Sequence, residues 1–156
     1  MSLTLYVDGA SRGNPGKGGL GVFGFSTSKK QPLLQEGAFF GHVTNNVAEY
    51  AALAYALFLV KEHKLTSTLT IYADSELLVK QINGIYKVKN ETLARWHRLI
   101  MLLAYPFDMK ISHVRREKNK EADLLANKGV DTKIPPHASF IALLKRHNLV
   151  PDRLLS

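Results

Sequence analysis

The first part of the chain alternates hydrophobic and polar residues in the way that is typical of β-strands. Residues 3–8 follow a period of two and run into the glycine-rich stretch 9–16, which predicts a strand followed by a loop. Residues 19–26 and 33–43 have the character of two more strands, joined by a short polar turn. Because strands connected by short turns pair antiparallel, these segments predict a three-stranded antiparallel meander.

Helical and strand patterns alternate after the meander. Residues 46–63 are rich in alanine and leucine and predict the first long helix, with Thr44 and Asn45 placed to cap it. Further strands are predicted over residues 69–74 and 107–114, and further helices over 75–82, 91–104, 119–130 and, from a weaker pattern, 138–147. This order predicts an α/β protein with a five-stranded mixed sheet, in which two parallel strands extend the meander and helices flank the sheet.

The composition excludes several classes of protein. The 156 residues suit one domain, and 46% of them are hydrophobic, which is enough to bury a core. Cysteine is absent, which excludes disulfides, thiolate zinc sites and cysteine nucleophiles. The longest apolar stretch, residues 50–60, is shorter than the ~18 residues of a membrane-spanning helix, and the N-terminus lacks a signal-peptide pattern. We therefore expect a soluble, cytoplasmic protein with no membrane partner.

The charge of the chain favours a polyanionic partner. It carries 21 Lys and Arg against 13 Asp and Glu, a formal net charge of +8, and its pI is about 9.7. Basic surfaces bind nucleic acid because the contact releases counterions from the phosphates. Nucleic acid is therefore the partner that the charge favours, although net charge alone is a weak indication.

Two of the predicted strands are near duplicates of each other. Residues 3–8 read LTLYVD and residues 69–74 read LTIYAD, so each strand finishes with an acid, Asp8 or Asp74. If the strands pair in parallel and in register, these two residues lie about 4.8 Å apart. Adjacent carboxylates repel each other, and a shared divalent cation with hard oxygen ligands would replace that repulsion with attraction. The alternative is that each acid is simply solvated at the end of its strand.

Two more acids fall on predicted helices. Glu49 shares a helical stripe with Leu53 and Val60 and so points towards the core, where an unpaired carboxylate is costly unless it binds a metal. Asp123 lies in the first turn of its helix, next to Ala122. An acid there could simply interact with the helix dipole, which is worth ~0.3–1 kcal/mol. Four acids on elements that can converge nevertheless favour a metal site.

Four segments that contain these acids resemble the four motifs of the type 1 ribonuclease H family, and they occur in the family's order. They are YVDGASRGNPG at residues 6–16, TNNVAE at 44–49, YADS at 72–75 and NKEADLLA at 119–126. The resemblance implies a ribonuclease H-like fold and endonucleolytic cleavage of the RNA strand in RNA–DNA hybrids. It also implies that Asp8, Glu49, Asp74 and Asp123 hold Mg²⁺ or Mn²⁺. Phosphodiester hydrolysis of this kind uses two cations ~3.5–4 Å apart.

The same resemblance assigns substrate contacts. It implies that Gly9, Asn45 and Asn46 contact the RNA strand, whose 2′-hydroxyl distinguishes RNA from DNA. It assigns a pocket for a DNA-strand phosphate to Asn14 and Thr44. Asparagine and threonine also serve turns and helix caps very often, so a purely local role stays open for these positions.

The sequence departs from the family pattern in two places. Many members have a catalytic histidine in a loop before the last acid, whereas residues 114–119 contain none, and Arg116 is nearest to that position. An arginine there is our candidate for stabilising charge at the scissile phosphate, and the alternative is that Arg115 or Arg116 is simply a solvated loop residue. His113 alternates with the preceding strand residues and is expected to be structural. Residues 83–90 leave no basic protruding handle, so Tyr86, Lys87 and Lys89 are candidates for gripping the hybrid.

The motifs also divide the chain. We expect residues 1–130 to form the ribonuclease H-like catalytic domain, and residues 131–156 to form a C-terminal extension that packs on it or trails from it. No obligate protein partner is expected.

Two alternative functions stay open: a non-catalytic module that binds RNA–DNA hybrids, and a nuclease of the same fold that acts on another nucleic acid.

Overall fold

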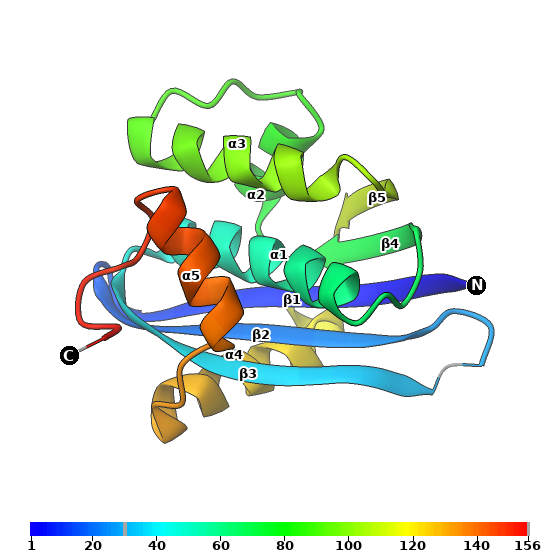
Figure 1. Ribbon diagram of the computed structural model, residues 1–156, viewed down its shortest axis with the longest axis horizontal. Helices are drawn as coiled ribbons and strands as arrows, with labels where there is room; N and C mark the ends of the chain where they lie inside the picture. Colours follow the sequence, from blue (N-terminus) through cyan, green and yellow to red (C-terminus); the bar gives the residue numbers. More distant parts are fainter. Residues whose placement is uncertain (30, 156) are drawn as a thin grey trace.

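The predicted five-stranded mixed sheet is confirmed. The structure is a computed structural model that describes residues 1–29 and 31–155 (Figure 1). The strands are β1 Ser2–Gly13, β2 Gly16–Ser26, β3 Pro32–Val43, β4 Thr68–Ala73 and β5 Asp108–His113. Within the described residues the sheet has the order β3-β2-β1-β4-β5. The β1–β2 and β2–β3 pairs are antiparallel, whereas the β1–β4 and β4–β5 pairs are parallel.

Helices cover both faces of this sheet (Figure 1). They are α1 Asn45–Glu62, α2 Glu76–Ile82, α3 Glu91–Ala104, α4 Lys120–Thr132 and α5 Ala138–Arg146, with a short 3-10 helix, η1, at Arg116–Lys118. Helix α4 packs against β2 and β3 on one face, whereas α1 lies on the other face beneath α3. Residues 48–60 of α1 are all buried, because this helix lies between the sheet and the outer helices.

One predicted boundary is wrong. We expected residues 9–16 to form a loop, but β1 continues to Gly13 and pairs with β2 as far as Gly16. Glycine serves a close approach here rather than a turn, because a Cβ at Gly9 would lie 2.1 Å from the carbonyl carbon of Ala48 on α1. Asp8 therefore lies inside a strand, where β1 leaves β4 and continues along β2 alone.

Helix α4 lies so close to β2 that only glycine fits beneath it. A Cβ at Gly21 would lie 2.0 Å from the carbonyl oxygen of Ala122, far inside van der Waals contact. At Gly24, on the same strand, the contact would be with a side chain and not with backbone, because a Cβ there would lie 2.5 Å from the tip of Leu5. The two glycines therefore provide a matched pair of sites for testing this packing.

We expect Gly21→Ala to lower the free energy of unfolding by about 1–3 kcal/mol, because the backbone of α4 must move to admit the methyl group. Gly24→Ala is the control and should have a smaller effect, since its methyl group would meet the tip of a side chain and not helix backbone. Urea unfolding followed by circular dichroism measures both variants. Equal midpoints for the two would contradict the close packing of α4 on β2.

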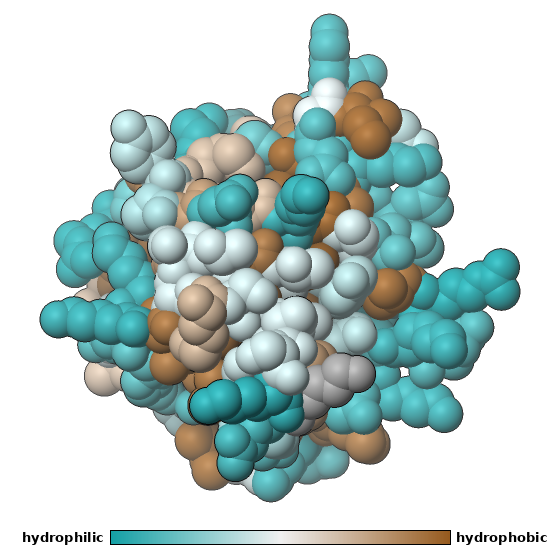
Figure 2. Space-filling model, turned by 90° about the vertical axis from the view of Figure 1, so that its right-hand side faces the viewer, coloured by the Kyte–Doolittle hydropathy of each residue, from teal (hydrophilic) through white to brown (hydrophobic). Residues whose placement is uncertain are grey.

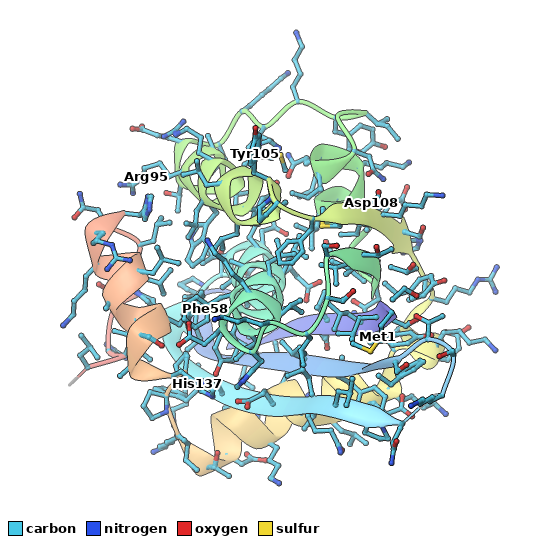
Figure 3. The ribbon with its side chains drawn as sticks, turned by 45° about the vertical axis from the view of Figure 1, so that its right-hand side comes forward. Met1, Phe58, Arg95, Tyr105, Asp108 and His137 are labelled. Carbon is cyan, nitrogen blue, oxygen red and sulfur yellow. The ribbon has the colours of Figure 1, made fainter. Side chains whose placement is uncertain are left out.

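The C-terminal extension packs on the rest of the chain. Phe140 of α5 is fully buried, and its ring centroid lies 4.8 Å from that of Tyr55 and 5.3 Å from that of Phe58, both on α1. Just before α5, His137 Nε2 lies 3.2 Å from Glu36 Oε1 on β3. Figure 3 labels Phe58 and His137 at this junction. Aromatic and polar contacts thus hold α5 against α1 and β3.

The end of the molecule at which β1 and β4 begin is largely hydrophilic. Figure 2 shows this face with hydrophilic side chains projecting around its rim and hydrophobic residues scattered among them. None of the described helices has the length and hydropathy needed to span a bilayer. The acidic residues of interest lie away from this face, towards the carboxyl ends of the parallel strands.

Candidate active site

The near-duplicate strands β1 and β4 pair in parallel and in register, as the sequence predicts. The last pair joins Val7 to Ala73. Asp8 and Asp74 follow these residues directly, so the two carboxylates come together at the carboxyl ends of neighbouring parallel strands. This edge is where open α/β sheets place their sites.

Helix α1 adds Glu49 to the pair. The predicted inward orientation is confirmed, because Glu49 is only 8% exposed. Its Oε1 accepts a hydrogen bond of 2.6 Å from the backbone N–H of Gly9, whereas its Oε2 is buried without a hydrogen-bond partner. The lack of a side chain at Gly9 lets β1 approach α1 closely enough for this contact.

Asp8, Glu49 and Asp74 form a compact acidic cluster. Each residue offers one carboxylate oxygen, and these three atoms lie within 4.8 Å of one another. Three carboxylates at such distances repel strongly unless protons or cations intervene. The donor set consists of oxygen alone, which suits a hard divalent cation.

Burial and mutual repulsion disturb the titration of this cluster. Burial, reinforced by the neighbouring charges of Glu49 and Asp74, raises the pKa of Asp8 far above the usual range of a carboxyl group. Burial also raises the pKa of Glu49 to about 7, although the neighbouring Asp8 carboxyl group and the Gly9 N–H act in the opposite direction. Without a cation, the cluster therefore holds protons at pH values where ordinary carboxyl groups are ionised.

We expect the metal-free protein to lose stability as the pH rises from about 4.5 to about 7. In this window the unfolded chain ionises Glu49 while the folded chain keeps it protonated, so a rising pH favours unfolding. Thermal unfolding in EDTA at a series of pH values measures the loss, and Mg²⁺ should reduce it. Glu49→Gln is the control and should lack this component. An equal loss in the variant and the parent would assign the effect to another group.

Asp123, the fourth predicted acid, lies at the rim of the cluster. It is half-buried in the first turn of α4, and a hydrogen bond with it contributes to the raised pKa of Asp8. The side-chain amide of Asn127 donates to the Asp123 carbonyl oxygen at 3.0 Å. Among the described residues, the cluster within 4.8 Å consists of the other three acids, so Asp123 contributes from further out.

A polar cavity of about 370 Å³ opens over the acids. Besides the four carboxylates it is lined by predicted site residues, Gly9, Asn45, Asn46 and Arg116, and by residues that the sequence analysis did not single out, Ala10, Ser11 and Ser75. Arg116 belongs to η1. Its positive charge partly offsets the rise in the pKa of Glu49 that burial causes. The structure therefore brings together the four acids, the three predicted RNA-strand residues and the arginine.

Asn119 is a residue next to the acids that the sequence analysis did not single out. It is fully buried, and its side-chain amide donates to the Val7 carbonyl oxygen at 2.9 Å and to Asp74 Oδ2 at 3.1 Å. The backbone carbonyl oxygen of Asn119 accepts a hydrogen bond of 3.1 Å from the backbone N–H of Asp123. Asn119 thus links β1, Asp74 and the start of α4. An asparagine before a helix suggests a cap, but this side chain makes no capping bond.

The residues predicted to hold a DNA-strand phosphate line a second cavity of about 330 Å³. Asn14 and Thr44 belong to it, together with Asn46, which also lines the acidic cavity. Both have local roles as well: Thr44 Oγ1 caps α1, and Asn14 Oδ1 accepts from the N–H of Asn45 at 3.0 Å. Asn90 and Thr92 of the α3 start are lining residues that the sequence analysis did not name.

Other candidates lie away from the acids. Lys87 and Lys89 are exposed on the segment between α2 and α3, which contains no helix over residues 83–90, all of which are described. Tyr86 in this segment accepts a hydrogen bond of 3.2 Å from Lys80 Nζ. His113 ends β5, as expected, and shares a strand face with the buried Ile111, but it is itself exposed and does not pack into the core.

Comparisons with known proteins find clear relatives. The profile of the reverse transcriptase-like family matches residues 6–129. The ribonuclease HI of Halobacterium salinarum is 38% identical over 128 residues, which is 81% of this chain and 63% of the relative. The crystal structure of RNase H1 from that archaeon superposes with a TM-score of 0.80 at 34% identity, covering 85% of this chain and 99% of the other. LC11-RNase H1, crystallised in complex with an RNA/DNA hybrid, gives 0.78 at 37% identity, covering 83% and 97%.

Some relatives are much longer than this chain. A bifunctional protein of Mycobacterium tuberculosis is 34% identical over 132 residues, which is 84% of this chain but 36% of the relative. The chain therefore spans about a third of that protein and 63% of the Halobacterium sequence. The family profile ends at residue 129, before the C-terminal extension.

Proposed function

The chain belongs to the reverse transcriptase-like family and, within it, to the type 1 ribonucleases H, and we propose that it hydrolyses the RNA strand of RNA–DNA hybrids. The observation that carries this proposal is the cluster of Asp8, Glu49 and Asp74, with carboxylate oxygens within 4.8 Å of one another. A hybrid as substrate is further supported by the relative of 37% identity that was crystallised with one.

The acids fit divalent cations, Mg²⁺ or Mn²⁺, as cofactors. All donors in the cluster are carboxylate oxygens, and the buried Glu49 Oε2 has no hydrogen-bond partner, so a cation would satisfy it. We assign Asp8, Glu49 and Asp74 as ligands, with Asp123 completing the set from the rim. When two such cations are bound, they supply an activated water and stabilise charge on the scissile phosphate and the leaving 3′-oxygen.

The other residues of the acidic cavity bind and orient the substrate. Asn45 and Asn46 begin α1 on the same rim as Gly9, where they can address the 2′-hydroxyl, a group that both donates and accepts hydrogen bonds. Arg116 offers a guanidinium that can hold a phosphate through two parallel hydrogen bonds. Because arginine stays protonated, Arg116 stabilises charge and does not transfer protons.

We propose that the DNA strand contacts residues outside the acidic cavity. We assign one of its phosphates to the cavity of Asn14 and Thr44, which shares Asn46 with the acidic cavity. Lys87 and Lys89, on the exposed segment between α2 and α3, would contact the hybrid further out. Their role would be electrostatic, because exposed lysines bind phosphates largely as point charges.

A panel of labelled substrates tests the proposed function. The protein is incubated with an RNA–DNA hybrid, double-stranded RNA, duplex DNA and each single strand, with Mg²⁺, Mn²⁺ or EDTA. We expect cleavage of the hybrid alone, in its RNA strand, and only with a cation. Hybrid binding without cleavage would favour a binding module, and cleavage of another substrate in preference would favour a nuclease of different specificity.

A further inference from the structure

Three cavities adjoin one another through shared lining residues. The acidic cavity and the cavity of Asn14 share Asn46. The cavity of Asn14 in turn shares Thr44 and Thr92 with a third cavity of about 430 Å³. A strand bound at the acids and at Asn14 therefore has a path that continues into the third cavity.

The third cavity is lined by a cationic side chain with one buried nitrogen that has no hydrogen-bond partner among the described residues. Arg95, on α3, lines it, and its Nε is buried without a hydrogen-bond partner. Figure 3 labels Arg95 on the side of α3 that carries the C-terminal segment. A buried N–H of a charged group is unfavourable when it lacks an acceptor. The geometry therefore calls for an acceptor at this place, and a charged one most of all.

The wall of this cavity comes from the part of the chain that lies beyond the family profile. Residues 148–152 line it opposite Arg95, and the N–H of His42 on β3 donates to the Asp152 carbonyl oxygen at 2.8 Å. Leu149 and Leu154, which are buried, anchor the segment on both sides. The cavity is thus built jointly by the catalytic fold and the extension, and its wall is fixed in place.

The lining of the cavity combines one arginine, one acid and two threonine hydroxyl groups. Asp152 is the acidic residue of its lining, and no ion pair joins its carboxylate to Arg95 in the described part of the chain. Thr44 and Thr92 add hydroxyl groups that can donate to an oxygen. A phosphodiester has the charge and the two free oxygens that match the fork of an arginine.

We propose that Arg95 and the wall formed by residues 148–152 make an additional subsite for a backbone phosphate of the DNA strand, next to the one at Asn14 and Thr44. This subsite rests on the proposed function, since it presupposes that a hybrid lies along these cavities. It extends the grip on the uncleaved strand in a chain that lacks a protruding basic handle.

Hybrid binding in EDTA, followed by fluorescence anisotropy, tests the subsite without cleavage. We expect Arg95→Ala to weaken binding about tenfold, as the loss of a charged hydrogen bond would, and to lower the slope of log K against log salt by about 0.9. Arg98→Ala is the matched control, because it removes the same charge from the exposed side of the same helix. It should change the affinity by less than about twofold, the effect of one screened surface charge.

Two further experiments test whether Arg95 contacts a phosphate of the DNA strand. Methylphosphonates, which are neutral, are placed singly along the DNA strand, and we expect one position that weakens binding by the parent but not by Arg95→Ala. Asp152→Asn should strengthen binding, because it removes an opposing charge. Arg95→Gln serves instead if the alanine variant fails to fold in thermal melts.

The outcomes separate this inference from the proposed function. An Arg95 variant that binds like the Arg98 control overturns the subsite, and so does an Arg95 effect with no responsive DNA phosphate. Either result can occur while the parent still cleaves the hybrid. Failure of the parent to cleave or bind a hybrid would instead overturn the proposed function itself.

Discussion

Asp8→Asn or Asp74→Asn abolishes hybrid cleavage while the fold stays intact and, without metal, becomes slightly more stable. Asparagine has nearly the shape of aspartate but lacks the charge that holds a cation. Losing several kcal/mol of transition-state stabilisation lowers the rate by about 10³-fold at least. Stability rises because the three acids lie within 4.8 Å of one another and repel when ionised.

Single-turnover cleavage in Mg²⁺ measures the first effect, and thermal unfolding in EDTA near pH 8 measures the second. Asp108→Asn is the matched control, because Asp108 is exposed at the start of β5 and pairs with Thr68, at the opposite end of β4 from Asp74 (Figure 3). It should leave both quantities unchanged. Cleavage near the parental rate by either cluster variant would contradict the assignment of the metal ligands.

Arg116→Ala is expected to lower kcat by about 10²–10³, as the loss of one charge-stabilising donor does in other enzymes. Arg116 lines the acidic cavity, and its charge acts on the buried Glu49. The loop before Asp123 contains no histidine, and Arg116 is the cationic residue in the lining of the acidic cavity. The fold should be unaffected, because the side chain is exposed.

Arg115→Ala provides the comparison, since this neighbouring arginine is exposed and does not line the cavity. Single-turnover rates over a range of pH distinguish the two variants. Parental rates in both variants would show that neither arginine contributes to the chemistry.

The acidic cluster could be predicted from the sequence because its signals are local to each element. The repeated strand pattern is enough to align Asp8 with Asp74, since parallel pairing in register leaves both acids at the same level. The helical stripe of Glu49 is enough to turn that carboxylate inward. What the pattern could not supply was the approach of α1 to Gly9, because glycine is typical of turns and of close contacts alike.

The remaining features depend on contacts between distant parts of the chain. Asn119 looks like a helix cap in sequence, and its role follows only from the proximity of Val7 and Asp74. The weak helical pattern near the C-terminus does not reveal that Phe140 packs between rings of α1. The cavity of Arg95 needs β3, α3 and the extension together, so no single motif could predict it.

Strand-specific cleavage under controlled metal concentration tests the central claim most directly. A hybrid labelled on both strands is mixed with excess metal-stripped protein, and Mg²⁺ is then titrated. We expect no cleavage before Mg²⁺ is added, cleavage of the RNA strand alone afterwards, and a rate that rises more steeply than the first power of its concentration. Cleavage in EDTA, cleavage of the DNA strand, or an intact RNA strand at saturating Mg²⁺ and Mn²⁺ would contradict a metal-dependent ribonuclease H built on Asp8, Glu49 and Asp74.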